Sequence, residues 1–199
     1  MNTSSVRVPS TRVRERNEAR RLHILRAAAR VFRRRGIAAA GMREIAEEAG
    51  LSPGNLYHYF SGKDELLLYC QERTLERMQA ALDSASGDAA SRLRAVLRAH
   101  VHCMLDELEG GTAHLDLEAL PKKLREGVIA KRDAYEQGVR AVVAEGMRAG
   151  EFARGDAALV TRAMLGAVNW TARWYRPEGD QGPGEIAAAL SDYLVKGLA

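Results

Sequence analysis

The chain has 199 residues, of which 46% are hydrophobic and 28% charged, and its formal net charge is +4. This is the composition of an ordinary globular protein, and it excludes a chain that is disordered over most of its length. No apolar run approaches the ~18 residues of a membrane helix, and two cysteines are too few for a disulfide framework or a four-cysteine zinc site. The N-terminus lacks the apolar segment of a signal peptide, so we expect a cytoplasmic protein without membrane association.

The charge is divided unevenly along the chain. Residues 1–63 hold 13 Lys/Arg against 5 Asp/Glu, whereas residues 64–199 hold 17 against 21. A small basic part on a mildly acidic body indicates that the two parts have different roles. Concentrated positive charge attracts DNA, although a basic end is also common as a solvated surface. A sequence-independent chromosome-coating protein would need basic surface along the whole chain, and the acidic body argues against one.

Apolar residues recur at the helical period along almost the whole chain, which predicts an all-α protein. Glycine, proline and serine divide this pattern into nine or so segments. We expect helices at about residues 14–35, 42–49, 53–59, 63–83, 89–109, 113–120, 121–150, 156–175 and 184–198. Gly36 ends the first helix, Gly41 is a weak N-cap of the second, and Ser52 and Pro53 begin the third.

The segment Met42–Lys63, MREIAEEAGLSPGNLYHYFSGK, contains two short helices joined by a tight turn with a glycine. This is the skeleton of a helix-turn-helix. The second short helix would expose groups that bind base edges or phosphates, namely Ser52, Gly54, Asn55, Tyr57, His58 and Tyr59. The segment is also compatible with an ordinary helical hairpin around an aromatic core.

The run Ile-Ala-x-x-Ala-Gly-Leu-Ser-x-Gly-x-Leu-Tyr-x-Tyr-Phe-x-x-Lys is far longer than a chance match. It resembles the N-terminal domain of TetR-family transcriptional regulators, and the similarity extends without a gap from about Leu22 to Leu68. In that family the third helix is the recognition helix, the aromatic element after it contacts phosphates, and the lysine clamps the DNA backbone. The resemblance therefore implies DNA contacts from Arg43, Ser52, Pro53, Gly54, Asn55, Tyr57, His58, Tyr59 and Lys63, with Phe60 as a core anchor.

The resemblance also implies a division into a helix-turn-helix domain at residues 13–62 and a ligand-binding and dimerisation domain at residues 63–199. One position departs from the family pattern. The family usually has Ser or Thr before the second helix to contact phosphate, whereas Ala40 and Gly41 stand here, so arginines of the first helix or the N-terminal arm would have to replace that contact. Residues 1–12 are expected to form a disordered arm, and nearby arginines either enter a minor groove or stay solvated, namely Arg12, Arg14 and Arg16.

The family implies a helical ligand cavity and a homodimer whose last two helices form a four-helix bundle. A single recognition helix reads few base pairs, so two copies on a palindrome are the usual solution. The segment GAVNWTARWYRPEG at residues 166–179 is similar to a subgroup that controls fatty-acid, steroid or related catabolism, several members of which sense acyl-CoA thioesters. Trp170 and Trp174, one helical turn apart, suit either a wall for a flat ligand or the core or dimer seam.

The candidate ligand-binding residues are His100, Met104, Arg162, Asn169, Trp170, Arg173 and Trp174. Arginines pair with phosphates or a carboxylate, and a long acyl chain would suit a cavity lined by Leu, Met and Trp. His100 lies on the apolar stripe of its helix and His102 on the far side, so they cannot hold one metal, and His100 is expected to be a hydrogen-bonded core or pocket residue. Cys70 and Cys103 are expected to be small buried apolar residues.

The sequence therefore predicts a dimeric repressor that binds a palindromic operator and is released by a small molecule, with an acyl-CoA thioester as the expected effector. The alternatives are a repressor of an efflux or stress gene that senses a lipophilic drug-like compound, and an activator on the same scaffold. An enzyme is not expected, because the chain lacks a nucleophile elbow, a phosphate-binding loop, a metal-binding helix and a dinucleotide fingerprint. Neither a cofactor nor a metal site is predicted.

Overall fold

The computed structural model describes residues 11–105 and 117–199, and within these ranges it contains helices and no strands. The α-helices are α1 (Thr11–Arg35), α2 (Met42–Glu48), α3 (Pro53–Tyr59), α4 (Lys63–Ser84), α5 (Ala89–Leu105), α7 (Lys122–Ala149), α8 (Ala157–Trp174) and α9 (Pro183–Lys196), with a 3₁₀ helix at Leu117–Ala119. The all-α prediction is confirmed. Most of the expected N-terminal arm and the region 106–116 lie outside the described residues, and none of the described helices is long and apolar enough to cross a membrane.

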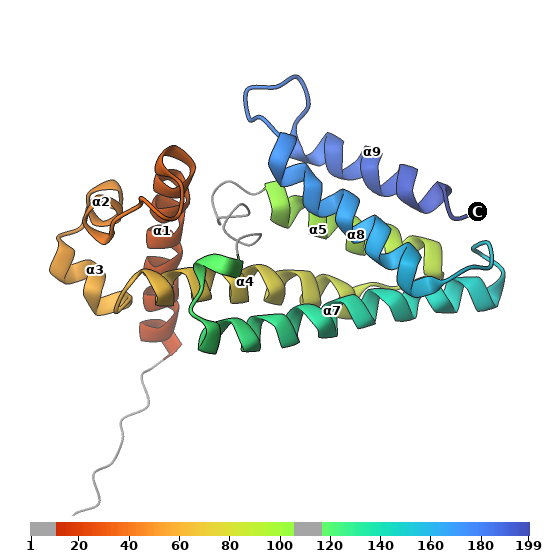
Figure 1. The fold of residues 1–199 in the computed structure, drawn as a ribbon, viewed down its shortest axis with the longest axis horizontal. Coiled ribbons are helices and arrows are strands. Elements are labelled where there is room, and N and C mark those ends of the chain that lie inside the picture. Colours follow the sequence, from red (N-terminus) through yellow and green to blue (C-terminus); the bar gives the residue numbers. More distant parts are fainter. Residues whose placement is uncertain (1–10, 106–116) are drawn as a thin grey trace, which may run out of the picture.

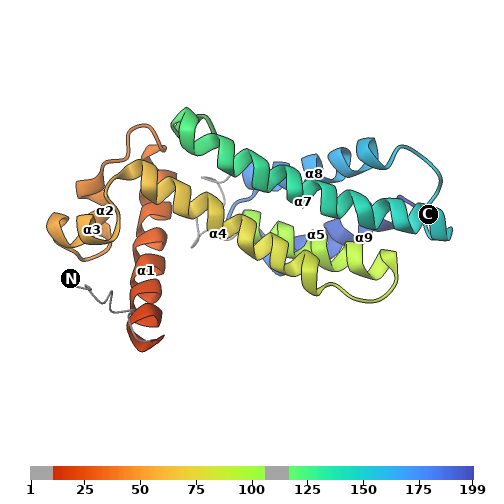
Figure 2. The same cartoon turned by 90° about the horizontal axis from the view of Figure 1, so that it is seen from below.

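The helices form two lobes that α4 connects (Figure 1). The small lobe contains α1, α2 and α3. In the larger lobe, the rest of α4 packs against α5 and α7, and α8 and α9 lie on the other side of α5. Helix α5 is central to the larger lobe, since it packs against α4, α7, α8 and α9. In Figure 2, α4 and α7 lie side by side, and the C-terminus lies far from the small lobe.

The turn between α2 and α3 depends on local sequence. Gly50 has φ +62°, a left-handed conformation that residues with a side chain rarely adopt. Ser52 Oγ accepts a hydrogen bond from the Asn55 N–H at 3.3 Å, and Pro53 occupies the first helical position, as predicted. The apolar side chains of this lobe are buried against α1, including Ile45, Ala46, Ala49, Leu56 and Phe60.

The predicted apolar stripes of the larger lobe are also buried. They comprise Leu66, Leu67, Cys70, Thr74 and Met78 on α4, and Leu93, Val96, Leu97, His100, Val101, Met104 and Leu105 on α5. Cys103 is buried as well, which confirms that both cysteines are interior residues. Tyr193 shares α9 with the buried residues Ile186 and Val195, but its own side chain is 76% exposed. Helix α9 therefore presents an aromatic ring to the outside of this chain.

Side chains fasten α1 to the first half of α4. Glu18 accepts hydrogen bonds from the Tyr69 hydroxyl at 2.6 Å and from Arg73 at 3.2 Å. The Arg21 guanidinium lies 4.3 Å from the centre of the Phe60 ring and 4.5 Å from that of Tyr69, which is cation–π geometry. These contacts reach into α4 as far as Arg73, so the first half of α4 is fastened to the small lobe.

Candidate nucleic-acid interface and ligand cavity

Helix α3 presents a polar face to solvent. The side chains of Ser52, Pro53, Asn55, Tyr57 and His58 are exposed together with Gly54, and Tyr59 is half-buried. Leu56 and Phe60, in contrast, are fully buried and hold the helix against the core. Arg43 is exposed in the first turn of α2. The predicted DNA-facing residues of α2 and α3 thus lie on the surface of one small lobe.

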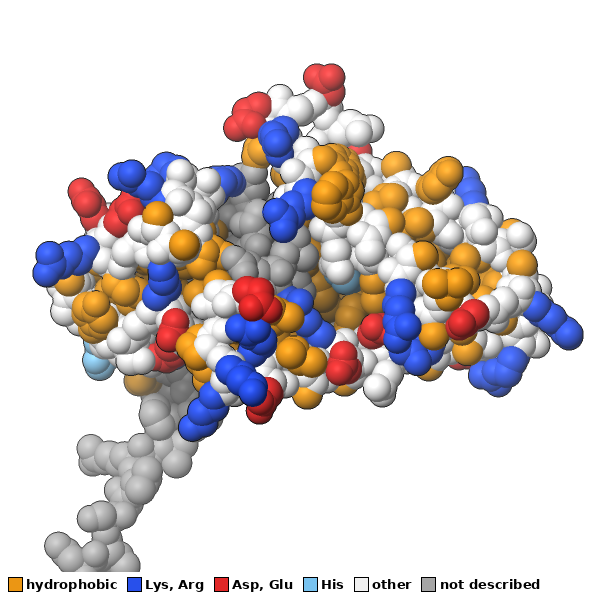
Figure 3. Space-filling model, in the orientation of Figure 1, with side chains coloured by type: hydrophobic (Ala, Val, Ile, Leu, Met, Phe, Trp, Pro, Cys, Tyr) orange, Lys and Arg blue, Asp and Glu red, His pale blue; other side chains and the backbone are white. Residues whose placement is uncertain are grey.

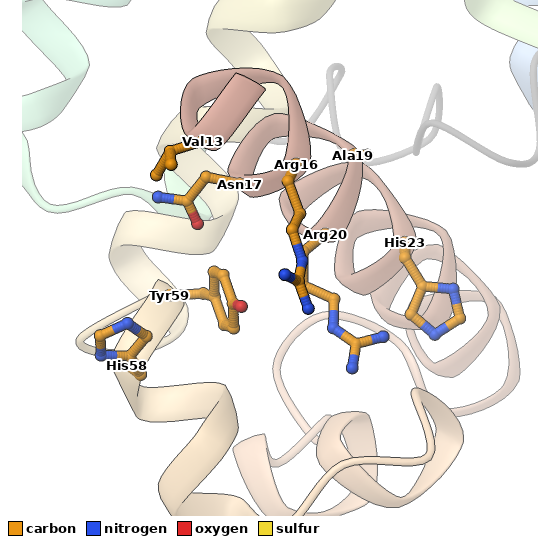
Figure 4. Close-up of a pocket in the computed structure, with 8 residues that line it drawn as sticks. All are labelled: Val13, Arg16, Asn17, Ala19, Arg20, His23, His58 and Tyr59. Atoms are coloured by element: carbon orange, nitrogen blue, oxygen red, sulfur yellow. The ribbon is translucent and has the colours of Figure 1, made fainter. Parts of the chain in front are cut away.

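A groove of about 640 Å³ lies between the N-terminal half of α1 and the end of α3 (Figure 4). Its lining consists of Val13, Arg16, Asn17, Ala19, Arg20, His23, His58 and Tyr59. Arg16 and Arg20 are one helical turn apart, and their side chains extend into the groove in Figure 4. Neither has an acidic partner among the described residues, so the groove carries positive charge beside α3.

The groove changes the interpretation of the N-terminal arginines. Helix α1 begins at Thr11, so Arg12 and Arg16 belong to a helix rather than to the end of a disordered arm. Arg20 was not among the predicted contact residues. The sequence could have indicated Arg20, because it lies four residues after Arg16 and residues four apart share a helix face.

Lys63 has partners that the sequence analysis did not predict. Its ammonium donates hydrogen bonds to the carbonyl oxygens of Ile37 at 2.9 Å, Ala38 at 3.1 Å and Ala40 at 3.2 Å. An ammonium has three N–H donors, so these bonds use its full donor capacity. In this structure Lys63 fastens the loop between α1 and α2 to the start of α4.

The arginines at the end of α1 are also occupied. Arg30 and Arg34 pair with Glu48 at 2.6 and 2.7 Å. Hydrogen bonds from Arg30 and then Arg34 lower the pKa of the Glu48 carboxyl. Gly41 caps α2 without a side-chain bond, as predicted, and Ala40 is buried. In this structure these two arginines therefore bind Glu48 of α2, and they do not replace the phosphate contact that the resemblance implies before α2.

A cavity of about 300 Å³ lies in the larger lobe between α4, α5, α7 and α8. Its lining mixes apolar and polar groups, namely Leu75, Met78, His100, Arg132, Tyr135, Glu136, Arg162, Leu165, Gly166 and Asn169. Three of the predicted ligand-binding residues, His100, Arg162 and Asn169, therefore share one cavity. Arg132 and Tyr135 were not among the predicted ligand-binding residues, because in the sequence Arg132 belongs to a charged group typical of solvated surface and Tyr135 to the apolar stripe of its helix.

His100 is the centre of a buried hydrogen-bond chain in this cavity. Its Nδ1 lies 3.2 Å from the Tyr135 hydroxyl and its Nε2 lies 3.0 Å from Asn169 Oδ1. Burial lowers the pKa of His100 from 6.5 to about 4, so the ring is neutral at pH 7 and carries one N–H. Tyr135 then donates to Nδ1, and the Nε2–H donates to Asn169. This confirms the prediction of a hydrogen-bonded core or pocket histidine.

The remaining predicted ligand residues do not line this cavity. Met104 is buried in the core of α5. Trp170 and Trp174 are 64% and 46% exposed, and Arg173 is exposed beside them. The reason is the phase of α8: successive helical residues are rotated by about 100°, so Asn169 faces inward while Trp170 faces outward.

The outward side of α8 is apolar. Leu159 is 66% exposed, and Ala163, Gly166, Trp170 and Trp174 continue the same side of the helix. Hydrophobic surface gathers over α8 in Figure 3. Tyr193 on α9 adds a further exposed ring. A row of exposed large apolar side chains along one helix is typical of an interaction surface rather than of an ordinary solvated one.

Comparisons with known proteins agree with this architecture. Residues 24–70 match the model for bacterial regulatory proteins of the tetR family, and residues 86–198 match that for a tetracyclin repressor-like C-terminal domain. The transcriptional repressor KstR2 of Rhodococcus jostii is 27% identical, over 90% of this chain and 91% of its own length. The regulator PksA of Bacillus subtilis is 47% identical over 62 residues, which is 30% of its own length.

Solved structures show the same fold over nearly the full chain. PfmR of Thermus thermophilus, a TetR-family regulator, is 33% identical with a TM-score of 0.80, over 88% of this chain and 98% of its own. AibR in complex with isovaleryl coenzyme A and operator DNA is 23% identical with a TM-score of 0.75, over 90% and 97%. These relatives are transcriptional regulators rather than enzymes. With a family model matched over more than half of its length and a full-length relative above 30% identity, the chain belongs to the TetR family of bacterial transcriptional regulators.

Proposed function

We propose that this regulator is a dimeric repressor that binds a palindromic operator in the cytoplasm and is released from DNA by an acyl-CoA thioester. The observation that carries the DNA-binding part is the exposed polar face of α3 next to the cations of the α1–α3 groove. The first can read base edges, and the second attracts backbone phosphates, which is the division of labour in DNA readers. Both lie on one small lobe, so one duplex can contact them together.

Within this proposal, Ser52 and Asn55 contribute to base selection because they are exposed on α3. Tyr57, His58, Tyr59 and Arg43 bind the backbone, and Pro53 and Gly54 allow α3 to approach the duplex closely. Arg16 and Arg20 add two phosphate contacts from α1. Lys63 acts by holding the loop before α2 in place, because its three N–H donors bind carbonyl oxygens of that loop.

The apolar outer face of α8 and α9 supports a homodimer. A second copy of the chain, related by a two-fold axis, would place the same face against itself and bury Leu159, Trp170, Trp174 and Tyr193. Each half-site of a palindrome would then meet one recognition helix. The two tryptophans serve the dimer seam in this arrangement, which is the alternative that the sequence analysis had left open for them.

The cavity supports regulation by a small molecule. It is lined by His100, Arg162 and Asn169 and lies in the larger lobe. Helix α4 connects this lobe to the lobe proposed to bind DNA. The structurally similar AibR was solved with a coenzyme A thioester and operator DNA. A ligand releases the repressor only if it binds more tightly to a dimer geometry that fits DNA poorly, so differential affinity is required.

The test begins with a duplex selected by the purified chain from a random pool. Fluorescence anisotropy then measures its affinity for that duplex and for a scrambled one at matched salt, with and without acyl-CoAs, free acids and cationic dyes. We expect specific binding of at least about a thousandfold over the scrambled duplex, and loss of binding with a thioester. Equal affinity for both duplexes would refute sequence-specific operator binding. Release by a cationic dye but by no thioester would favour the drug-sensing alternative.

A further inference from the structure

The cavity is small for a ligand pocket. Its volume is about 300 Å³ between the described residues, at the lower end of the usual range for ligand pockets. A group the size of a water molecule takes up about 30 Å³, so this space holds about ten non-hydrogen atoms. The apolar residues in the sequence predicted a cavity for a long acyl chain between Leu, Met and Trp side chains. The volume of about 300 Å³ is small for such a chain, and neither tryptophan lines the cavity.

One wall of the cavity offers hydrogen-bond donors. The Oδ1 atom of Asn169 accepts from His100 Nε2–H, which fixes the orientation of the amide and leaves its two N–H groups for other partners. Because His100 is fully buried and neutral, it holds Asn169 in place without adding charge. Tyr135 in turn fixes the histidine ring from the other side. The amide donors of Asn169 are therefore held rigidly at the cavity that this residue lines.

The charged groups of the cavity favour an acceptor or anion over a cation. Arg132 donates from Nη2 to Gln71 Oε1 at 2.9 Å, and although burial lowers its pKa to about 10, it stays charged at pH 7. Glu136 is the acidic residue of the lining, and Oε1 of its carboxylate lies 2.7 Å from Arg140 and 3.4 Å from Arg162. Two guanidinium groups thus balance the negative charge of Glu136. The charge of Arg132 therefore makes the cavity lining net positive. Apolar walls from Leu75, Met78 and Leu165 remain for hydrocarbon.

We infer that the cavity binds a short acyl group, of about ten non-hydrogen atoms or fewer, whose carbonyl or carboxylate oxygen accepts hydrogen bonds from Asn169 Nδ2 and Arg132. This rests on the proposed function, in which occupancy of the cavity controls DNA binding, and it specifies the effector. In a thioester, the nucleotide part of coenzyme A stays outside the cavity. Arg162, which is exposed beside Glu136, is then available to its phosphates without deep desolvation.

The experiment measures binding by calorimetry to the full-length chain, using hexanoate, hexanoyl-CoA, palmitoyl-CoA and hexylamine as probes. We expect hexanoate or hexanoyl-CoA to bind, palmitoyl-CoA to bind at least about tenfold more weakly than hexanoyl-CoA, and hexylamine not to bind. The free acid and the thioester together show which source supplies the acyl group. Equal affinity for the two chain lengths, or preference for the amine, would overturn the inference.

The decisive variant is Asn169→Asp, which keeps an acceptor for the His100 N–H but replaces the amide donors with a negative charge. We expect binding of the short acyl probe to weaken by about tenfold or more, with the thermal midpoint unchanged within about 2 °C. Gln137→Glu, the same chemical change on the exposed side of α7, is the matched control and should bind like the wild type. An Asn169→Asp chain that binds as tightly as the control would remove Asn169 from the site.

The DNA assay separates this inference from the proposed function. If hexanoyl-CoA binds but leaves affinity for the selected duplex unchanged, the cavity assignment stands and effector-driven release fails. If the wild-type chain binds its duplex specifically but binds none of the short acyl probes, specific operator binding is supported and the cavity assignment fails.

Discussion

Replacing Lys63 by alanine should destabilise the small lobe. The substitution removes the donor of three hydrogen bonds, and the carbonyl oxygens of Ile37, Ala38 and Ala40 lose their shared partner. Ala40 is buried and Ala38 is exposed. Water can therefore replace the lysine less easily at the Ala40 end of the loop than at Ala38. The loop leads directly into α2, whose N-cap Gly41 provides no side-chain bond of its own. Lys63 is thus one of the few groups that hold this connection in place.

The size of the effect follows from the bonds. A single hydrogen bond from a charged donor contributes about 1.5–3 kcal/mol net, and water will replace part of the set because Lys63 is only half-buried. We therefore expect a loss of about 2–3 kcal/mol in the free energy of unfolding. For a chain of this length that corresponds to a fall of about 4–12 °C in the thermal midpoint.

Urea unfolding of the Lys63→Ala chain measures this loss as a lower midpoint at an unchanged slope. Lys122→Ala is the matched control, because Lys122 is also the first residue of a helix but is exposed. The reasoning is refuted if the two variants are equally stable. If Lys63→Ala instead keeps full stability and lowers the salt dependence of DNA binding by about one unit, the lysine serves a phosphate alone.

Three further outcomes are expected. If the proposed dimer forms, Tyr193→Asp should convert it to monomer in sedimentation without unfolding the chain, since the ring is exposed in one chain. Ile129→Asp on α7 should leave the dimer intact. Burial lowers the pKa of His100 from 6.5 to about 4, so as pH falls the unfolded state takes up a proton at higher pH than the folded state does. The free energy of unfolding should therefore fall by about 3 kcal/mol as pH drops from 6.5 to about 4. His100→Phe should flatten this dependence in urea titrations at several pH values. The pKa of Glu48 is lowered in the folded state, so its contribution is present above pH 4.5 and lost below it, and Glu48→Gln should lose less stability on acidification than the wild type.

Features that depend on neighbouring residues could be predicted from the sequence. The turn at Gly50 and the cap at Ser52 are set within a few residues, and both are present as expected. The buried stripe of α5, including His100, follows from helical periodicity alone. These features locate the helix-turn-helix and one side of the cavity.

Features that depend on distant partners could not be predicted in the same way. The acceptors of Lys63 lie 23 to 26 positions earlier in the chain, and no periodic pattern connects them. For Trp170 and Trp174, the sequence left a ligand wall, the core and a dimer seam open. The buried residues Val168 and Thr171 set the phase of α8 and turn both rings outward. A sequence shows that a ring is apolar, but it does not show whether the same chain or a second copy covers it.

The contacts between α1 and α4 also determine which parts of the molecule can move as rigid bodies. Glu18 connects α1 to α4 as far as Arg73, so the first half of α4 moves with the recognition helix. Leu75 and Met78, in the second half, belong to the cavity wall. Between the halves, Thr74 Oγ1 donates to the Cys70 carbonyl at 3.0 Å, a bond that makes a helix easier to bend. The mechanical boundary of this regulator therefore lies inside α4, about three turns after the point where the sequence motif ends.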